Sequence, residues 1–234
     1  MQAFTDPDDS SAWLYQSWLV GGHAPAPPPH LLAATLQDGT LTVAASAPVP
    51  RTKLLVTVEG GAVEWEAGPS WRAEWRSQKL QAGIRTSLTV TCLGEELQME
   101  VGEGRQQVLA SGAANIQFQP RPDSETAAVL ETELDNCSQL LELEPESKWT
   151  LAMKALLLRA LDPHRHNTEI LGLYAQLQQV DCLRARYYED MKAKLIIETA
   201  LESAQNFDCL DLSSHKLSRK YHKQYLNLFR EVKY

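Results

Sequence analysis

The sequence predicts an α+β fold of several parts, in which an antiparallel β-sandwich is followed by a region of α-helical hairpins. In residues 31–121, short apolar runs alternate with turn residues, which is typical of a sandwich of short strands. In residues 122–206, apolar side chains recur at helical spacing. An aromatic-rich segment at 1–22, a proline-rich linker at 23–30 and a segment of different pattern at 207–234 complete the chain.

Length and charge restrict the classes of function. A chain of 234 residues, 44% of them hydrophobic, can form one large or two modest domains with real cores. Its net charge of −8 argues against a nucleic-acid partner, because neutralising phosphates requires clustered Lys and Arg. Met1–Ser10 lacks the pattern of a secretion signal, and no stretch approaches the roughly 18 to 20 apolar residues that span a bilayer. We therefore expect a cytoplasmic protein without a membrane span.

The cysteines predict neither a disulfide framework nor a metal site. They are widely separated, and none belongs to a Cys-x-x-Cys pair or has a histidine at ligand spacing. We interpret them as reduced thiols that fill apolar space in a reducing compartment. They are Cys92, Cys137, Cys182 and Cys209.

A short aromatic-rich helix is predicted from Ala12 to Val20, ending at Gly21-Gly22. Because an isolated helix of this length is marginal in water, its aromatic face must pack on a neighbour, which need not lie in this chain. Four prolines within Ala24–Pro29 fix φ and remove donors. Residues 23–30 therefore form a stiff linker at a domain boundary.

Alternation of apolar and polar residues predicts the strands of the sandwich. Leu54, Val56 and Val58 recur at every second position, as in a half-buried strand, and Gly60-Gly61 predicts a tight hairpin to the next run. The paired cysteines of antibody domains are missing, so the prediction is limited to an immunoglobulin-like architecture. The predicted strands are Leu31–Leu36, Leu41–Ala45, Leu54–Glu59, Ala62–Glu66, Trp71–Trp75, Ile84–Cys92, Leu97–Val101 and Ile116–Gln119.

After Pro122 the apolar period becomes helical. Asp123 or Ser124 caps a first helix, which Pro145 ends. Short breaks between consecutive helices indicate antiparallel hairpins stacked into a small solenoid. Further helices are predicted at about Ser147–Leu161, Asn167–Val180 and Leu183–Ala204, with Trp149, Met153, Ile170, Tyr174, Tyr187 and Leu195 among the buried residues.

The segment Phe207–Leu217 fits the leucine-rich repeat frame L-x-x-L-x-L-x-x-N-x-L, with His215 in the Asn position. One repeat cannot bury its own apolar face, and the basic, aromatic stretch Ser218–Tyr234 shows no second repeat. We therefore expect an orphan repeat followed by a divergent tail. This end of the chain should be poorly anchored and should be cut first by a protease.

Three segments, in this order, resemble the alpha subunits of Rab geranylgeranyltransferase, the type II enzyme. Residues 4–19 are similar to the last prenyltransferase alpha-subunit repeat, so residues 1–22 are interpreted as a remnant of that repeat. The segments Glu142–Trp149 and Leu158–Pro163 are similar to the helices after the sandwich of this family. Val180-Asp181, Arg184–Tyr187 and the lone leucine-rich repeat frame complete the order. Two features depart from the family: the upstream repeats that embrace the catalytic beta subunit are missing, and Gln16 stands where such repeats often carry Arg.

The resemblance implies a non-catalytic subunit of an enzyme that attaches geranylgeranyl groups to the C-terminal cysteines of Rab GTPases. It implies a prenyltransferase beta subunit as the direct partner, and the Rab escort protein and Rab GTPases as partners of the holoenzyme. It places the catalytic zinc in the beta subunit and no cofactor in this chain. The alternative is a stand-alone protein–protein interaction module with no transferase role.

Three aromatic residues are candidates for a partner-binding surface, namely Trp13, Tyr15 and Trp18. Aromatic residues at this spacing in helical repeats also pack between helices, so partner binding and packing both remain open. The two readings make different demands on the structure. Packing requires burial within the chain, whereas partner binding requires an exposed face.

No catalytic or metal-binding residue is predicted in this chain. His164 and His166 follow a helix-ending Asp-Pro without Cys or a close pair of carboxylates, so we expect a solvated turn. Glu142, Glu144 and Glu146 alternate in sequence, which scatters them around a helix and argues against paired acid–base work.

Overall fold

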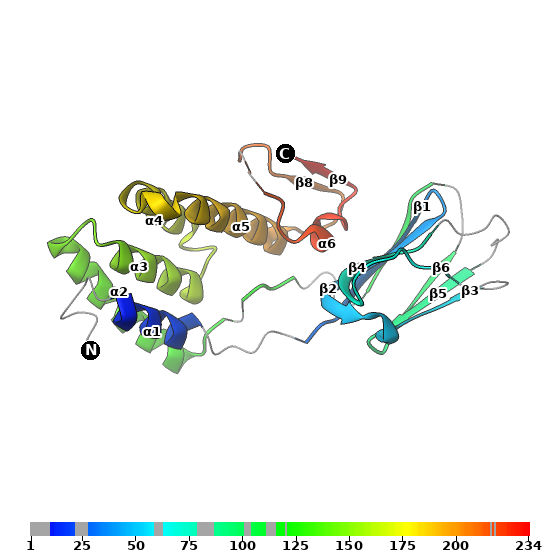
Figure 1. The fold of residues 1–234 in the computed structure, drawn as a ribbon, viewed down its shortest axis with the longest axis horizontal. Helices are drawn as coiled ribbons and strands as arrows, with labels where there is room; N and C mark the ends of the chain where they lie inside the picture. The colour runs from blue at the N-terminus through cyan, green and yellow to red at the C-terminus, as the bar shows by residue number, and fades with distance from the viewer. Residues whose placement is uncertain are drawn as a thin grey trace.

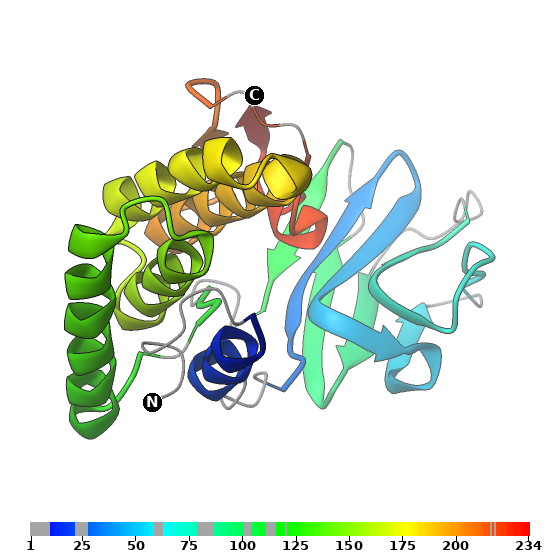
Figure 2. The same cartoon turned by 60° about the vertical axis from the view of Figure 1, so that its left-hand side comes forward.

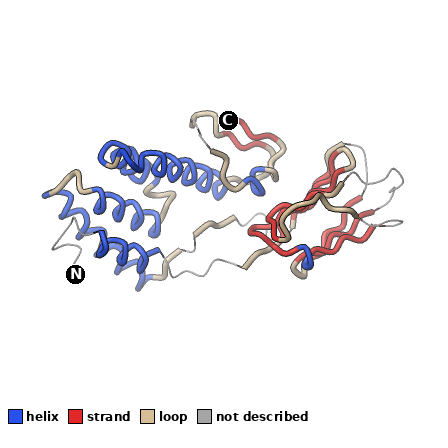
Figure 3. Tube along the Cα trace, viewed as in Figure 1, coloured by secondary structure: helices blue, strands red, loops and turns tan. Residues whose placement is uncertain are grey.

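The computed structural model describes residues 10–21, 28–58, 63–78, 87–100, 104–110, 116–119, 121–215, 217 and 219–234. Within these ranges the chain is mixed α+β, as predicted. Antiparallel sheets lie at one end of the molecule and the long helices at the other (Figure 1). The C-terminal segment lies beside the helices and reaches toward the sheets (Figure 3).

Two antiparallel sheets face each other across one apolar core. The first has the order β4-β2-β1-β7 and the second the order β3-β5-β6. Leu31, Leu41 and Val43 from the first sheet share this core with Leu88 and Val90 from the second. The strands are β1 Leu31–Gln37, β2 Thr40–Pro50, β3 Leu54–Val58, β4 Trp71–Arg76, β5 Ser87–Cys92, β6 Glu95–Glu100 and β7 Gln106–Leu109.

Two short turns determine the register of the hairpins. Asp38 and Gly39, which join β1 to β2, have φ angles of 51° and 76°. Leu93 and Gly94, which join β5 to β6, have φ angles of 54° and 87°. Positive φ at both central residues matches the right-handed twist of the strands, as in a type I′ turn. The predicted Gly60-Gly61 turn lies outside the described residues.

The sequence misplaced part of the sheet. Residues 116–119 are not a strand, whereas Gln106–Leu109, which was not predicted, forms β7 and pairs with β1. The described part of the predicted strand at 62–66, residues 63–66, does not form the predicted hairpin with β3. Instead, β3 pairs with β5, and Trp65 bridges to Ser77 beyond β4. The chain therefore crosses between the sheets at this point instead of making a hairpin.

The helices end close to where the sequence predicts. Asp123 caps α2 by accepting a hydrogen bond from the Thr126 amide at 2.7 Å. One predicted core residue is wrong: Tyr187 is exposed and the adjacent Tyr188 is buried. The helices are α1 Ser10–Gly21, α2 Ser124–Leu143, α3 Lys148–Leu161, α4 Asn167–Val180, α5 Ala185–Ser203 and the short α6 Lys223–Leu226, with 3-10 turns at Arg51–Lys53 and Cys182–Arg184.

The first helix packs on helices that follow the sheets in sequence. Trp13 of α1 is buried with Leu130 and Cys137 of α2 and with Met153 and Leu157 of α3. Figure 2 shows α1, in dark blue, beside the green helices. The neighbour that a short helix requires is therefore present within this chain. In sequence, all the strands of the two sheets lie between α1 and α2.

The C-terminal segment is anchored, contrary to the prediction. Its strands β8 Cys209–Asp211 and β9 Glu231–Lys233 pair in parallel. Its side chains form a second core with Ile197 and Leu201 of α5 and with the outer face of the first sheet. Burial of this apolar surface against α5 and the sheet stabilises the segment. The prediction had assumed that only further repeats could bury it. The buried residues of the segment are Leu210, Leu212, Tyr225, Leu226, Leu228 and Phe229.

Hydrogen bonds fix the same segment to the first sheet. The Arg105 guanidinium donates to the carbonyls of Asn227 at 2.8 Å and Phe229 at 3.2 Å. The Gln107 amide donates to the Leu228 carbonyl at 3.0 Å. These bonds give the three carbonyl groups hydrogen-bond partners in place of the water that they lose when the segment packs on the sheet. The sheets, α5 and the C-terminal segment thus share one interface.

Candidate partner-binding surface

The predicted aromatic surface is divided between two faces of α1. Trp13 is 2% exposed, whereas Tyr15 is 62% and Trp18 is 57% exposed. The rings of Tyr15 and Trp18 contact each other, with centroids 6.0 Å apart and planes tilted by 30°. Trp13 therefore serves packing within the chain, whereas Tyr15 and Trp18 lie on an exposed side of α1.

Two leucines that the sequence reading left out extend the exposed face. Leu14 is 57% and Leu19 is 46% exposed. With Tyr15 and Trp18 they occupy positions i, i+1, i+4 and i+5, which lie on one side of a helix. This spacing was the sequence signal for an apolar face. We refer to Leu14, Tyr15, Trp18 and Leu19 as the α1 face.

Contacts on the opposite side hold α1 in place. Trp13 is enclosed by α2 and α3, and the Gln16 amide donates to a Glu133 carboxylate oxygen of α2 at 2.7 Å. The polar residue at the position where the family often carries Arg is therefore used for a bond within the chain. A rigidly seated helix presents its apolar face without a further cost of ordering.

A buried cluster of charges centres on Glu198 of α5. Its carboxylate lies 2.6 Å from the Arg159 guanidinium of α3 and 2.9 Å from His222 Nε2 in the C-terminal segment. Burial acts to raise the pKa of Glu198, but the hydrogen bond from His222 and the charge of Arg159 outweigh it, so that pKa lies below its usual range. Because the cluster is enclosed and joins three segments, its role is to hold them together.

The other titratable residues singled out in the sequence are separated. His164 lies 2.7 Å from a Glu202 carboxylate oxygen, and His166 lies 3.9 Å from Glu169. Of the three glutamates, Glu142 alone lies on a helix, and all three are exposed, as expected for solvated residues. Across the described ranges, no group of three or more His, Cys, Asp or Glu is placed to hold a metal ion.

The cysteines divide into two classes. Cys92 and Cys137 are buried, as predicted, but Cys182 and Cys209 are exposed, so the prediction of apolar filling is wrong for them. Cys209 is exposed because it alternates with buried Leu210 along β8, and Cys182 lies at the start of a 3-10 turn. All four thiols are free.

None of the helices in the described ranges is both long and apolar enough to cross a membrane. No family model matches the chain. The geranylgeranyl transferase type-2 alpha subunit of Bos taurus is 33% identical over 216 residues, which cover 85% of this chain and 38% of that protein. The corresponding subunits of Mus musculus and Homo sapiens are 32% identical over the same shares. The chain thus spans 38% of the length of these relatives. Over most of its own length, this chain is similar to the geranylgeranyl transferase type-2 alpha subunits, as the resemblance of its residues predicted.

Proposed function

We propose that this chain acts as a non-catalytic alpha subunit, or part of one, in a protein geranylgeranyltransferase that modifies the C-terminal cysteines of Rab GTPases. The observation that carries the proposal is the similarity to type-2 alpha subunits along 85% of the chain. The packing of α1 on α2 and α3 supports it, since it makes one helical array out of segments on both sides of the sheets. The alternative of a stand-alone interaction module receives no support from the named relatives.

The proposed division of the chain follows the predicted order. We assign residues 1–22 to the last alpha-subunit repeat, 23–30 to a linker, 31–121 to an inserted immunoglobulin-like sandwich and 122–206 to the helical region. Residues 207–234 are assigned to the start of leucine-rich repeats. The parallel pairing of β8 with β9 supports this last assignment, because Cys209 pairs with Glu231 at an offset within the 20 to 29 residues of one repeat.

In this proposal the chain is a scaffold and the partner chain performs the chemistry. The α1 face is the surface for the prenyltransferase beta subunit, which is expected to carry the zinc that activates a cysteine thiolate. The Rab escort protein and Rab GTPases would meet the assembled holoenzyme in the cytoplasm. In this chain we assign no residue to catalysis, to zinc or to another cofactor.

Association with a type-2 beta subunit tests the proposal. We expect the full chain to co-elute with the beta subunit in size-exclusion chromatography. A Tyr15→Ala, Trp18→Ala double variant should bind at least about thirtyfold more weakly, since truncating even one aromatic anchor of an interface costs about 2 kcal/mol or more. Trp71→Ala is the matched control, because Trp71 on β4 is similarly exposed, at 61%. Equal binding by the double variant would show that α1 is not the interface.

Prenyl transfer tests the catalytic assignment separately. The chain is incubated with labelled geranylgeranyl diphosphate, a Rab substrate, escort protein and zinc, with and without the beta subunit. Transfer in the absence of the beta subunit, above the level of the same mixture without this chain, would show that this chain contains a catalytic site and would contradict the scaffold role.

A further inference from the structure

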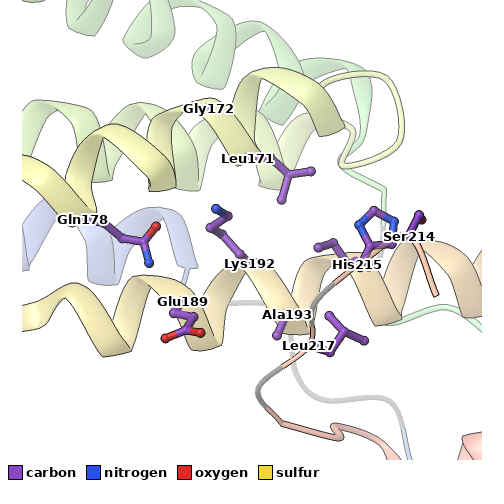
Figure 4. Close-up of a pocket in the computed structure, with 10 residues that line it drawn as sticks. Leu171, Gly172, Gln178, Glu189, Lys192, Ala193, Ser214, His215 and Leu217 are labelled. Atoms are coloured by element: carbon purple, nitrogen blue, oxygen red, sulfur yellow. The ribbon is translucent and has the colours of Figure 1, made fainter. Parts of the chain in front are cut away.

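A groove of about 620 Å³ runs between α4 and α5 and is bordered by the segment that follows β8 (Figure 4). It lies where two apolar cores meet. Leu171 belongs to the core of the helical region, and Ile196 and Leu217 belong to the core shared with the sheets. The lining residues are Leu171, Gly172, Gln178, Glu189, Lys192, Ala193, Ile196, Ser214, His215 and Leu217.

Gly172 leaves one wall of the groove open. It lies inside α4, where glycine costs about 1 kcal/mol relative to alanine. A Cβ atom built on Gly172 meets nothing within 4 Å, so no neighbouring side chain requires a glycine here. The residue weakens its helix without a packing reason, and its effect is to let another chain approach the α4 backbone closely.

Lys192 supplies an unpaired positive charge within the groove. Its side chain is half-buried, and no carboxylate of the described residues forms an ion pair with it. Two other lysines of the helical region are paired, Lys154 with Glu169 at 3.0 Å and Lys194 with Glu198 at 3.7 Å. Glu189, on the same helix, lies farther from Lys192 than ion-pair distance. In Figure 4 the Lys192 side chain rises from α5 toward α4.

The chemistry of the lining selects the kind of ligand. Small-molecule sites are mainly apolar and enclose their ligand, whereas this groove mixes apolar side chains with Lys192, Gln178, Ser214 and His215 and is open to solvent. An extended peptide fits better, because it presents apolar and charged side chains along its length and leaves one side in water. The charge of Lys192, which has no ion pair among the described residues, favours an acidic side chain at the matching position of the peptide.

We propose that the α4–α5 groove binds an extended peptide segment of a partner protein, with an acidic side chain paired to Lys192 and a neighbouring apolar side chain on Leu171, Ile196 and Leu217. The segment passes over Gly172, where a larger residue would obstruct it. None of the residues that line the groove belongs to the α1 face, so the proposal is tested without the beta subunit.

Two pools of random octapeptides test the proposal. They differ in one central residue, which is Glu in the first pool and Lys in the second. Each is titrated into the isotopically labelled full chain while amide NMR signals are followed. We expect the Glu pool to shift the signals of Gly172, Lys192, Ala193 and Leu217, and the Lys pool to leave them in place. Equal responses to both pools, or none, would overturn the proposal.

Variants separate recognition from folding. Lys192→Glu should bind the Glu pool at least about fivefold more weakly, the equivalent of one exposed ion pair, and should gain binding of the Lys pool. Lys53→Glu makes the same charge change at an exposed site in the sandwich and should change neither. Gly172→Leu should block binding of the Glu pool, and Gly172→Ala should weaken that binding by less. If Lys192→Glu binds both pools as the wild type does, Lys192 does not recognise the peptide and the proposal is wrong.

Discussion

Phe207 and Phe229 lie edge to face, with ring centroids 5.2 Å apart and planes at 66°. Phe207 stands three residues before Leu210, and Phe229 stands three residues before Val232. Because Leu210 pairs with Val232 in the parallel β8–β9 sheet, the two rings occupy equivalent positions in successive turns of the chain. The apolar frame that begins at Phe207 therefore begins again at Phe229.

Stability should depend strongly on Phe229, since it is fully enclosed by the core between α5 and the sheets. We expect Phe229→Ala to lower the free energy of unfolding by about 3 to 5 kcal/mol, through lost burial and the cavity left behind. Tyr234→Ala, which removes a half-exposed ring beside Lys220, should cost about 1 kcal/mol or less. Urea unfolding measures both. Equal, small effects would mean that the C-terminal segment is as weakly held as its sequence suggested.

The Glu198 cluster should also be essential for stability. Glu198→Gln removes the charge that compensates buried Arg159, and breaking a buried pair from one side costs about 3 to 5 kcal/mol. Glu169→Gln is the control, because Glu169 pairs with Lys154 near the surface and such pairs contribute about 0 to 1 kcal/mol. Both variants are compared with the wild type by denaturant unfolding. A loss below about 1 kcal/mol for Glu198→Gln would contradict the structural role of the cluster.

Acid sensitivity should follow from the same carboxylate. The pKa of Glu198 is lower in the folded chain than in the unfolded chain, so its contribution is fully present above the unfolded pKa of about 4.3. The contribution is lost as the pH falls through the lower, folded pKa. We expect the difference in unfolding free energy between wild type and Glu198→Gln to shrink as the pH falls below about 4.3. A difference that grows on acidification would show that the pKa of Glu198 is raised, and not lowered, in the folded chain.

Local signals made the helices predictable. Asp123 caps α2, Pro145 follows its end, and Asn167–Val180 was predicted with the bounds that are observed. The sequence did not show which of two adjacent aromatic residues is buried. Tyr187 and Tyr188 fit an apolar period equally well until the preceding 3-10 turn sets the phase of α5. For the same reason, no pattern within α1 could decide that Trp13, rather than Tyr15 or Trp18, is the buried ring.

Long-range pairing explains the errors in the sheets and the tail. Strand β7 contains two glutamines and is a strand because it pairs with β1, which lies far back in the sequence. The second turn of the C-terminal frame was missed because Phe229, Val232 and Tyr234 stand where the frame has leucines. The partners of Phe229 and Val232 on β8 and α5 become visible only in three dimensions.

The four thiols should react at two very different rates. Burial, followed by the charge of Glu133, raises the pKa of Cys137 to about 12, so about 10⁻⁴ of this thiol is ionised at pH 8. Burial and the charge of Glu95 also raise the pKa of Cys92. With a chromogenic disulfide reagent at pH 8, we expect Cys182 and Cys209 to react quickly and the buried pair to react at the rate of unfolding. A Cys182→Ser, Cys209→Ser variant serves as the control, since it should lose the fast phase and keep the slow one. Fast labelling of Cys137 in that folded variant would mean that the α1–α2–α3 core, which encloses it beside Trp13, opens far more readily than its packing implies.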